Sequence, residues 1–159
     1  MIDVPRADLV EKLTTALGVR RWVDAVAGNA PFDDLQQLLL VAYTEATPLS
    51  AAEIAEAMAH HPRIGEKPTG QSASAAMSRS EQGDATELAE ELAAGNAAYE
   101  ARFGRIFIIR AAGRSRAEIL AELHHRLELD DAADLAIVGE QLRDIALLRL
   151  EKLFGEDTP

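Results

Sequence analysis

Apolar residues recur at helical spacing along almost the whole chain of 159 residues. This spacing predicts helices over residues 8–17, 20–27, 32–46, 84–103 and 131–154. Two Ser-x-x-Glu capping boxes, which begin at Ser50 and Ser115, predict two more helix starts. Pro62 disfavours helical backbone at the preceding residue, so the helix after Ser50 should end near His60. We therefore predict an all-α fold of about seven to eight helices.

Residues 106–109 (Ile-Phe-Ile-Ile) form the only β-branched and aromatic cluster of the chain. The cluster is too short for a sheet, so we predict one buried extended segment near Phe107–Arg110. Extended backbone leaves N–H and C=O groups that need partners when they are buried. Those partners are either other protein groups or a bound ligand, and the sequence leaves both alternatives open. Since no repeat or composition shift divides the chain, we expect one domain over residues 1–159 with an ordered core of about 5–155.

The charge and composition exclude several classes of partner. The chain has 16 Lys+Arg and 27 Asp+Glu, for a net charge of −11, which repels phosphate backbones and anionic lipids. We therefore expect neither a nucleic acid nor a membrane as partner. The absence of cysteine excludes disulfides, thiolate metal sites and cysteine nucleophiles. The first ten residues lack the apolar region of a signal peptide, so we expect a cytoplasmic protein.

The four histidines form two adjacent pairs, His60-His61 and His124-His125. Adjacent side chains on a helix point about 100° apart, so neither pair makes a good metal site, and we expect no metal. We interpret His124 and His125 as solvated surface residues. His61 follows a predicted helix C-terminus, whose partial negative charge favours imidazolium by roughly 0.3–1 kcal/mol. It is therefore a candidate proton donor, with a simple capping role as the alternative.

Two further sets of residues allow both a structural and a functional interpretation. Ser78-x-x-Glu81 is a capping box, but Ser78, Glu81 and Gln82 also form a compact set of donors and acceptors for a polar ligand. Arg149 falls near the centre of the apolar sector of the last predicted helix. A core-facing arginine is costly unless it is paired or faces a polar cavity. We expect either an internal salt bridge or an anion-binding group in the wall of a pocket.

Four motifs follow one another along the chain: His61-Pro62-Arg63-Ile64-Gly65, Ser78-Arg79-Ser80-Glu81-Gln82, Asn96-x-x-Tyr99-Glu100-x-Arg102-Phe103-Gly104-x-x-Phe107-x-Ile109 and Leu148-Arg149-Leu150. In this order they resemble 2-oxo-4-hydroxy-4-carboxy-5-ureidoimidazoline (OHCU) decarboxylase, the enzyme of the last step from urate to S-allantoin. The resemblance extends from about Leu9 to Phe154. Many members have other residues where this chain has Arg63-Ile64-Gly65 and Arg105-Ile106, which affects the predicted pocket wall rather than the reaction.

The resemblance implies an all-α decarboxylase that acts on a small anionic substrate without a metal or organic cofactor. It assigns His61 as catalytic acid, and we hypothesise that Glu81 positions or reprotonates His61. It assigns substrate contacts to the following residues: Pro62, Ser78, Glu81, Gln82, Arg149 and the backbone of Phe107, Ile108 and Ile109. It leaves a homodimer open. The alternative function is a small acidic all-helical module that binds a partner protein without catalysis.

Overall fold

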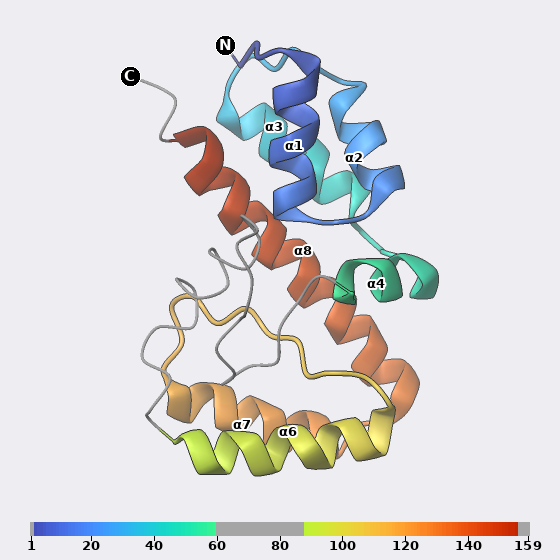
Figure 1. The fold of residues 1–159 in the computed structure, drawn as a ribbon, viewed down its shortest axis with the longest axis vertical. Coiled ribbons are helices and arrows are strands. Elements are labelled where there is room, and N and C mark those ends of the chain that lie inside the picture. The colour runs from blue at the N-terminus through green and yellow to red at the C-terminus, as the bar shows by residue number, and fades with distance from the viewer. Residues whose placement is uncertain (1, 60–87, 156–159) are drawn as a thin grey trace.

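The computed structural model describes residues 2–59 and 88–155, and in these residues it contains seven α-helices (Figure 1). They are α1 (Arg6–Ala16), α2 (Arg20–Ala27), α3 (Leu35–Glu45), α4 (Ala51–Met58), α6 (Ala89–Phe103), α7 (Arg116–Leu127) and α8 (Asp131–Gly155). The predicted all-α fold is confirmed. Within the same residues, no helix is long and apolar enough to cross a membrane.

The helix ends follow from local hydrogen bonds. The predicted capping boxes at Ser50 and Ser115 are both present and begin α4 and α7. Gly104 ends α6 in the left-handed conformation, with φ of 71°, which glycine adopts without a steric penalty. The predicted start of α3 at Phe32 is wrong, because the backbone of Phe32 pairs with that of Ile2 at 2.7 and 3.0 Å. The helix begins at Leu35 instead, where Asp34 accepts a hydrogen bond from the Gln37 N–H.

The long helix α8 connects two groups of helices (Figure 1). Helices α1, α3 and α4 pack against α8, and α2 packs between α1 and α3. At the N-terminal end of α8, α6 and α7 pack side by side and run in the same direction, because residues 104–115 cross back between them (Figure 1). The apolar side chains follow the same division. We call the cluster built from α1–α4 and α8 the large core and the cluster built from α6 and α7 the small core.

The large core surrounds Trp22, whose indole Nε1 donates to the Ala42 carbonyl at 3.0 Å and so ties α2 to α3. Its buried residues from α8 include Val138, Leu142, Ile145 and Leu150. Complete burial of an aliphatic side chain stabilises the fold by roughly 1.5–3 kcal/mol, so this part of the chain is held mainly by apolar packing.

Residues 106–111 run between the two cores. Ile108 belongs to the large core, whereas Phe107, Ile109 and Ala111 belong to the small core. Side chains that alternate between two sides are typical of extended backbone. The predicted buried extended segment is therefore confirmed, and it lies outside any strand pairing among the described residues.

Candidate functional site

Arg149 lies on the inner face of α8 and is only 1% exposed, as its place in the apolar sector predicted. Its Nη1 donates to the Thr15 carbonyl at 3.3 Å, in the last turn of α1. The C-terminal end of a helix carries a partial negative charge, so this position favours a cation. The fold thus holds a guanidinium inside the protein, close to the end of a neighbouring helix.

Two side chains from different helices hold the extended segment. The Ile108 carbonyl accepts a hydrogen bond from Arg126 Nη1 of α7 at 2.9 Å. The Arg110 N–H donates to Gln141 Oε1 of α8 at 2.9 Å. Arg149 lies about two turns further along the same helix as Gln141. Helix α8 therefore carries both an anchor of the segment and the predicted anion-binding arginine.

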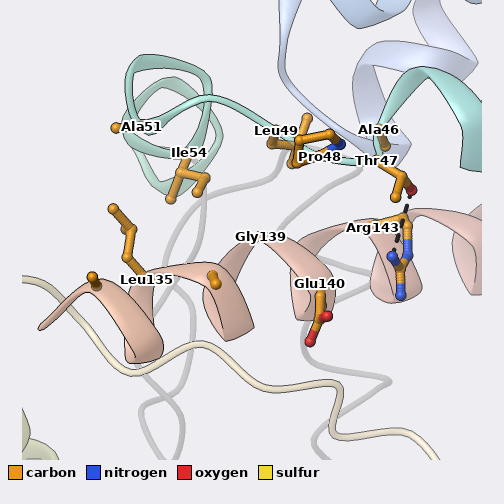
Figure 2. A pocket seen from close by; sticks show the side chains of 12 residues that line it. Ala46, Thr47, Pro48, Leu49, Ala51, Ile54, Leu135, Gly139, Glu140 and Arg143 are labelled. Carbon is orange, nitrogen blue, oxygen red and sulfur yellow. Dashed lines mark hydrogen bonds between the residues drawn. The ribbon is translucent and has the colours of Figure 1, made fainter. Parts of the chain in front are cut away.

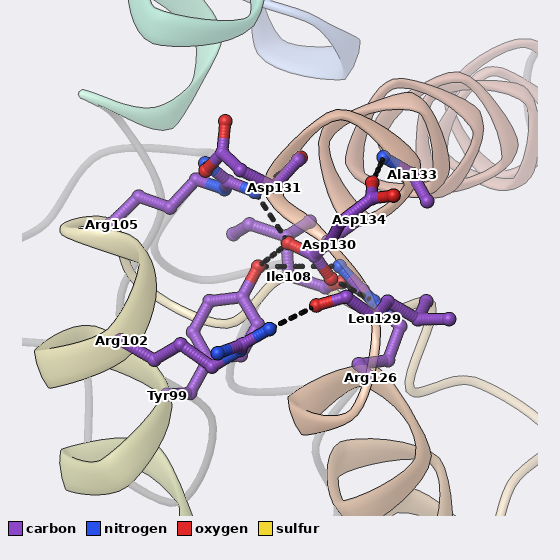
Figure 3. A network of polar contacts seen from close by, with 10 residues as sticks. All are labelled: Tyr99, Arg102, Arg105, Ile108, Arg126, Leu129, Asp130, Asp131, Ala133 and Asp134. Carbon is purple, nitrogen blue, oxygen red and sulfur yellow. Dashed lines mark hydrogen bonds and ion pairs between the residues drawn. The ribbon is translucent and has the colours of Figure 1, made fainter.

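Arg126 is part of a buried polar network with Tyr99, Arg105 and Asp134 (Figure 3). Its Nε pairs with Asp134 Oδ1 at 2.6 Å, and the side chains of both residues are 0% exposed. The Tyr99 hydroxyl donates to the other carboxylate oxygen, Oδ2, which also pairs with Arg105 Nη2 at 2.6 Å. These three partners offset the free-energy cost of removing the Asp134 carboxylate from water. The network therefore joins α6, α7 and the start of α8.

The pKa values of two network members are shifted. Burial raises the pKa of the Tyr99 hydroxyl to about 12, and its hydrogen bond to Asp134 acts in the same direction. For Arg105, burial by itself lowers the pKa, but the hydrogen bonds to Asp134 and Asp131 outweigh it and the pKa is raised. Both groups therefore keep their protons at neutral pH. Their role at that pH is to donate hydrogen bonds to Asp134.

Only part of the predicted site can be located. Phe107, Ile108, Ile109 and Arg149 are described, and all four are buried. Ile108 and the inner face of α8 contribute to the same large core, which brings the segment and the helix of Arg149 together. The remaining predicted site residues lie outside the described residues: His61, Pro62, Ser78, Glu81 and Gln82. They belong to the part of the chain between α4 and α6, so their roles stay predictions.

Arg126 and Asp134 were not singled out from the sequence. Arg126 follows Ile119 and Leu123 at helical spacing on the buried face of α7, so the argument that identified Arg149 could also have found it. Asp134 offers no such signal, because an acidic residue in the first turn of a helix is common at exposed positions. The structure shows instead that Asp134 is buried by the two arginines and the tyrosine.

A separate pocket of about 370 Å³ lies between α4 and α8 (Figure 2). Its lining is mainly apolar, with Ile54 and Leu135 on facing helices and with Glu140 and Arg143 also contributing. Arg143 Nη1 donates to the Thr47 hydroxyl at 3.4 Å. None of the predicted site residues that the structure describes lines this pocket. We therefore do not assign the reaction to it.

The histidines of α7 fit the surface interpretation, because both His124 and His125 are exposed. Across residues 2–59 and 88–155, no group of three or more His, Asp or Glu side chains is arranged to hold a metal ion. Of the predicted substrate contacts, the structure describes the Arg149 guanidinium and the backbone of Phe107, Ile108 and Ile109.

Comparison with known proteins identifies the family. The family model described as OHCU decarboxylase matches residues 3–151 of this chain. The chain belongs to the OHCU decarboxylase family. Family membership confirms the predicted resemblance, and the members of this family are decarboxylases (carboxy-lyases).

Individual relatives agree with this family. The uric acid degradation bifunctional protein TTL of Arabidopsis thaliana is 37% identical over 108 residues, which are 64% of this chain and 33% of that protein. The chain therefore spans about a third of the length of this curated relative. A solved OHCU decarboxylase, crystallised in the presence of (S)-allantoin, is 29% identical with a TM-score of 0.74, covering 91% of this chain and 98% of the other. A solved (S)-allantoin synthase shares the fold at 19% identity and a TM-score of 0.67, covering 94% of this chain and 50% of the other.

Proposed function

We propose that this chain converts OHCU to S-allantoin in urate degradation, with His61 as the proton donor. The observation that carries the proposal is the family match, which covers residues 3–151 and so includes every predicted site residue from His61 to Arg149. The geometry of the described residues is consistent with it, because Arg149 is a buried cation and the substrate is an anion. The alternative of a protein-binding module explains neither observation.

The proposed reaction needs an electron sink, which the substrate itself contains. Decarboxylation breaks the bond between the carboxylate and a ring carbon and leaves an electron pair on that carbon. A ring C=N lies next to it and accepts the pair, so no metal or organic cofactor is required. A proton must then reach one face of the new centre. The protein's tasks are therefore to hold the anion, transfer protons and exclude the other face.

The predicted residues divide these tasks among them. His61 donates the proton, and Glu81 positions or reprotonates it. The Arg149 guanidinium and backbone N–H groups of the segment 107–109 neutralise the anionic substrate and the charge that develops on it. The ring of the substrate is held by the remaining polar side chains, Ser78 and Gln82, beside Pro62.

A direct assay tests the reaction. OHCU is generated in solution from urate by oxidation and hydrolysis, and circular dichroism follows the formation of optically active allantoin. We expect the wild-type protein to accelerate this step. Replacement of the general acid in His61→Gln should lower kcat by about 10²- to 10⁴-fold, because that is the usual contribution of a general acid.

The matched control is His125→Gln, which makes the same substitution at an exposed position of α7. It should leave the rate at the wild-type level. A folded His61→Gln variant with undiminished turnover would contradict the role of His61, and an inactive wild-type protein would contradict the proposed function itself.

We also propose that the chain forms a single catalytic domain and acts in the cytoplasm. The proposal also includes pairing with a second copy of the chain. Ile137 and Leu148 support this pairing, since they lie on α8 and are only partly buried. Analytical ultracentrifugation of the purified protein measures the association.

A further inference from the structure

The extended segment 106–111 has two backbone edges with different surroundings. In extended backbone, the N–H and C=O of one residue point to the same edge, and those of the next residue point to the opposite edge. The side chains of Ile106 and Ile108 pack in the large core and those of Phe107 and Ile109 in the small core, and by its position in the chain Arg110 continues the even-numbered set. The backbone N–H and C=O groups of the even-numbered residues therefore point to one edge of the segment, and those of the odd-numbered residues point to the other edge.

Protein side chains occupy the even-numbered edge. Arg126 Nη1 donates to the Ile108 carbonyl, and Gln141 Oε1 accepts from the Arg110 N–H, each at 2.9 Å. Within the described residues, no hydrogen bond reaches the backbone N–H or C=O groups of Phe107 and Ile109. The odd-numbered edge is thus the one that offers buried polar groups to a ligand.

The guanidinium of Arg126 is fixed independently of the segment. Its Nε pairs with Asp134 at 2.6 Å, and its Nη2 lies 3.4 Å from the Tyr99 hydroxyl. Its Cζ also lies 5.0 Å from the centre of the Phe107 ring, which packs on it from the segment itself. A planar guanidinium held at two points outside the segment, by Asp134 and Tyr99, sets the position of the Ile108 carbonyl, which a lysine ammonium could not do in the same geometry (Figure 3).

From these contacts we infer that Arg126 is a positioning residue for decarboxylation. It holds the even-numbered edge of the segment, together with Gln141, so that the backbone groups of Phe107 and Ile109 face the substrate in a fixed orientation. The inference rests on the proposed function and deepens it. Donors that are already oriented need no rearrangement when charge develops on the substrate, and small displacements of such groups are costly to the rate.

The test compares two matched arginine variants. Arg126→Lys keeps a positive charge beside Asp134 but removes the fork that reaches Ile108. Arg105→Lys makes the same change at the other arginine bound to Asp134, which has no hydrogen bond to residues 107–109. Both variants should lose stability, measured by urea unfolding. Only Arg126→Lys should also lower kcat/KM by about 10- to 100-fold, the effect of a misplaced binding group.

Two further measurements separate positioning from general destabilisation. Hydrogen exchange followed by mass spectrometry should show faster exchange of residues 106–111 in Arg126→Lys than in Arg105→Lys. Gln141→Met removes the second anchor without touching the Asp134 network, and it should change exchange and kcat/KM in the same direction. This variant also decides the matter if Arg126→Lys does not fold.

The outcomes distinguish the inference from the function on which it rests. An inactive wild-type protein overturns the proposed function, and the inference with it. An active wild type in which Arg126→Lys loses no more kcat/KM than Arg105→Lys overturns the inference alone. A folded Gln141→Met variant with wild-type exchange and wild-type kcat/KM also overturns it.

Discussion

Two buried arginines contact different parts of the fold. Arg126 pairs with the carboxylate of Asp134 and donates to the Ile108 carbonyl, so it holds the extended segment. Arg149 lies on the inner face of α8 and donates to the Thr15 carbonyl at the end of α1. Because only Arg126 holds the extended segment, we propose positioning for Arg126 and keep substrate binding as the proposed role of Arg149.

Removal of the Arg149 charge should weaken catalysis. We expect Arg149→Met to lower kcat/KM for OHCU by about 10- to 100-fold, the size of a lost charge-assisted hydrogen bond. Arg143→Met is the control on the same helix, because Arg143 contacts Thr47, Asp144 and the Tyr43 ring instead. Steady-state kinetics of both variants provide the measurement. Equal kcat/KM values for the two would contradict a substrate role for Arg149.

Ionisation of Tyr99 offers a direct probe of the network. Burial raises its pKa in the folded protein to about 12 from 10.0, so the folded state favours the neutral phenol. The contribution of this group to stability is complete below about pH 10 and is lost as pH rises through 12. The chain has two tyrosines, so Tyr43→Phe leaves Tyr99 alone to report in the ultraviolet phenolate band.

In the Tyr43→Phe protein, the phenolate band should appear only near pH 12, together with the loss of folded structure. A full band at pH 10 in a protein that is still folded by circular dichroism would show that Tyr99 is not buried against Asp134.

At the scale of the elements, the helices were largely predictable because caps and apolar spacing are local signals. The end of α6 at Gly104 and the starts of α4 and α7 depend on residues that are adjacent in sequence. The start of α3 was missed because the pairing of Phe32 with Ile2 joins residues thirty positions apart. The local pattern of apolar and capping residues does not indicate a pairing between residues so far apart in the sequence.

The packing of α6 on α7 depends on the absence of a side chain at Gly95. A Cβ at this position would overlap the Leu123 side chain of α7, which is fully buried. We therefore expect Gly95→Ala to be destabilising, because overpacking costs about 1–3 kcal/mol and outweighs a gain in helix propensity of about 1 kcal/mol. Urea unfolding measures the change in the free energy of unfolding.

Gly139→Ala of α8 is the matched comparison. A Cβ there would lie 3.4 Å from Ile54 Cδ1, an ordinary contact. This variant should therefore keep most of the helix-propensity gain of about 1 kcal/mol and be neutral or stabilised. Equal stability of the two variants would mean that the close approach of α6 and α7 does not exist.

At the scale of the whole molecule, Asp134 connects the two cores. It lies in the first turn of α8, whose later turns build the large core, and its partners Tyr99 and Arg126 belong to α6 and α7. Two parts linked in this way should unfold together. Single site residues such as Arg149 could be predicted from the sequence. The polar network could not, because neither Arg126 nor Asp134 belongs to a motif that indicates pairing between separate helices.

Removal of the Asp134 charge should therefore affect the whole protein. Asp134→Asn leaves the buried Arg126 without a carboxylate and leaves Arg105 with only the exposed Asp131, so it should cost about 3–5 kcal/mol. Trp22 is the single tryptophan and lies in the large core, so its fluorescence should lose the native signal at the same lower urea concentration as the circular dichroism. Asp131→Asn, which removes an exposed partner of Arg105, should cost less than about 1 kcal/mol.

A Trp22 midpoint that stays at the wild-type value in Asp134→Asn, while the circular dichroism midpoint falls, would show that the two cores unfold separately.

The alternation of residues 106–111 between two hydrophobic environments restricts how this stretch of chain can change length. Adding or deleting one residue would turn Ile108 away from the large core and exchange the side chains that fill each interior. A change of two residues would preserve the alternation. Natural variants of this enzyme should therefore tolerate insertions in the surface turn around Gly113 far more readily than single-residue insertions a few positions earlier.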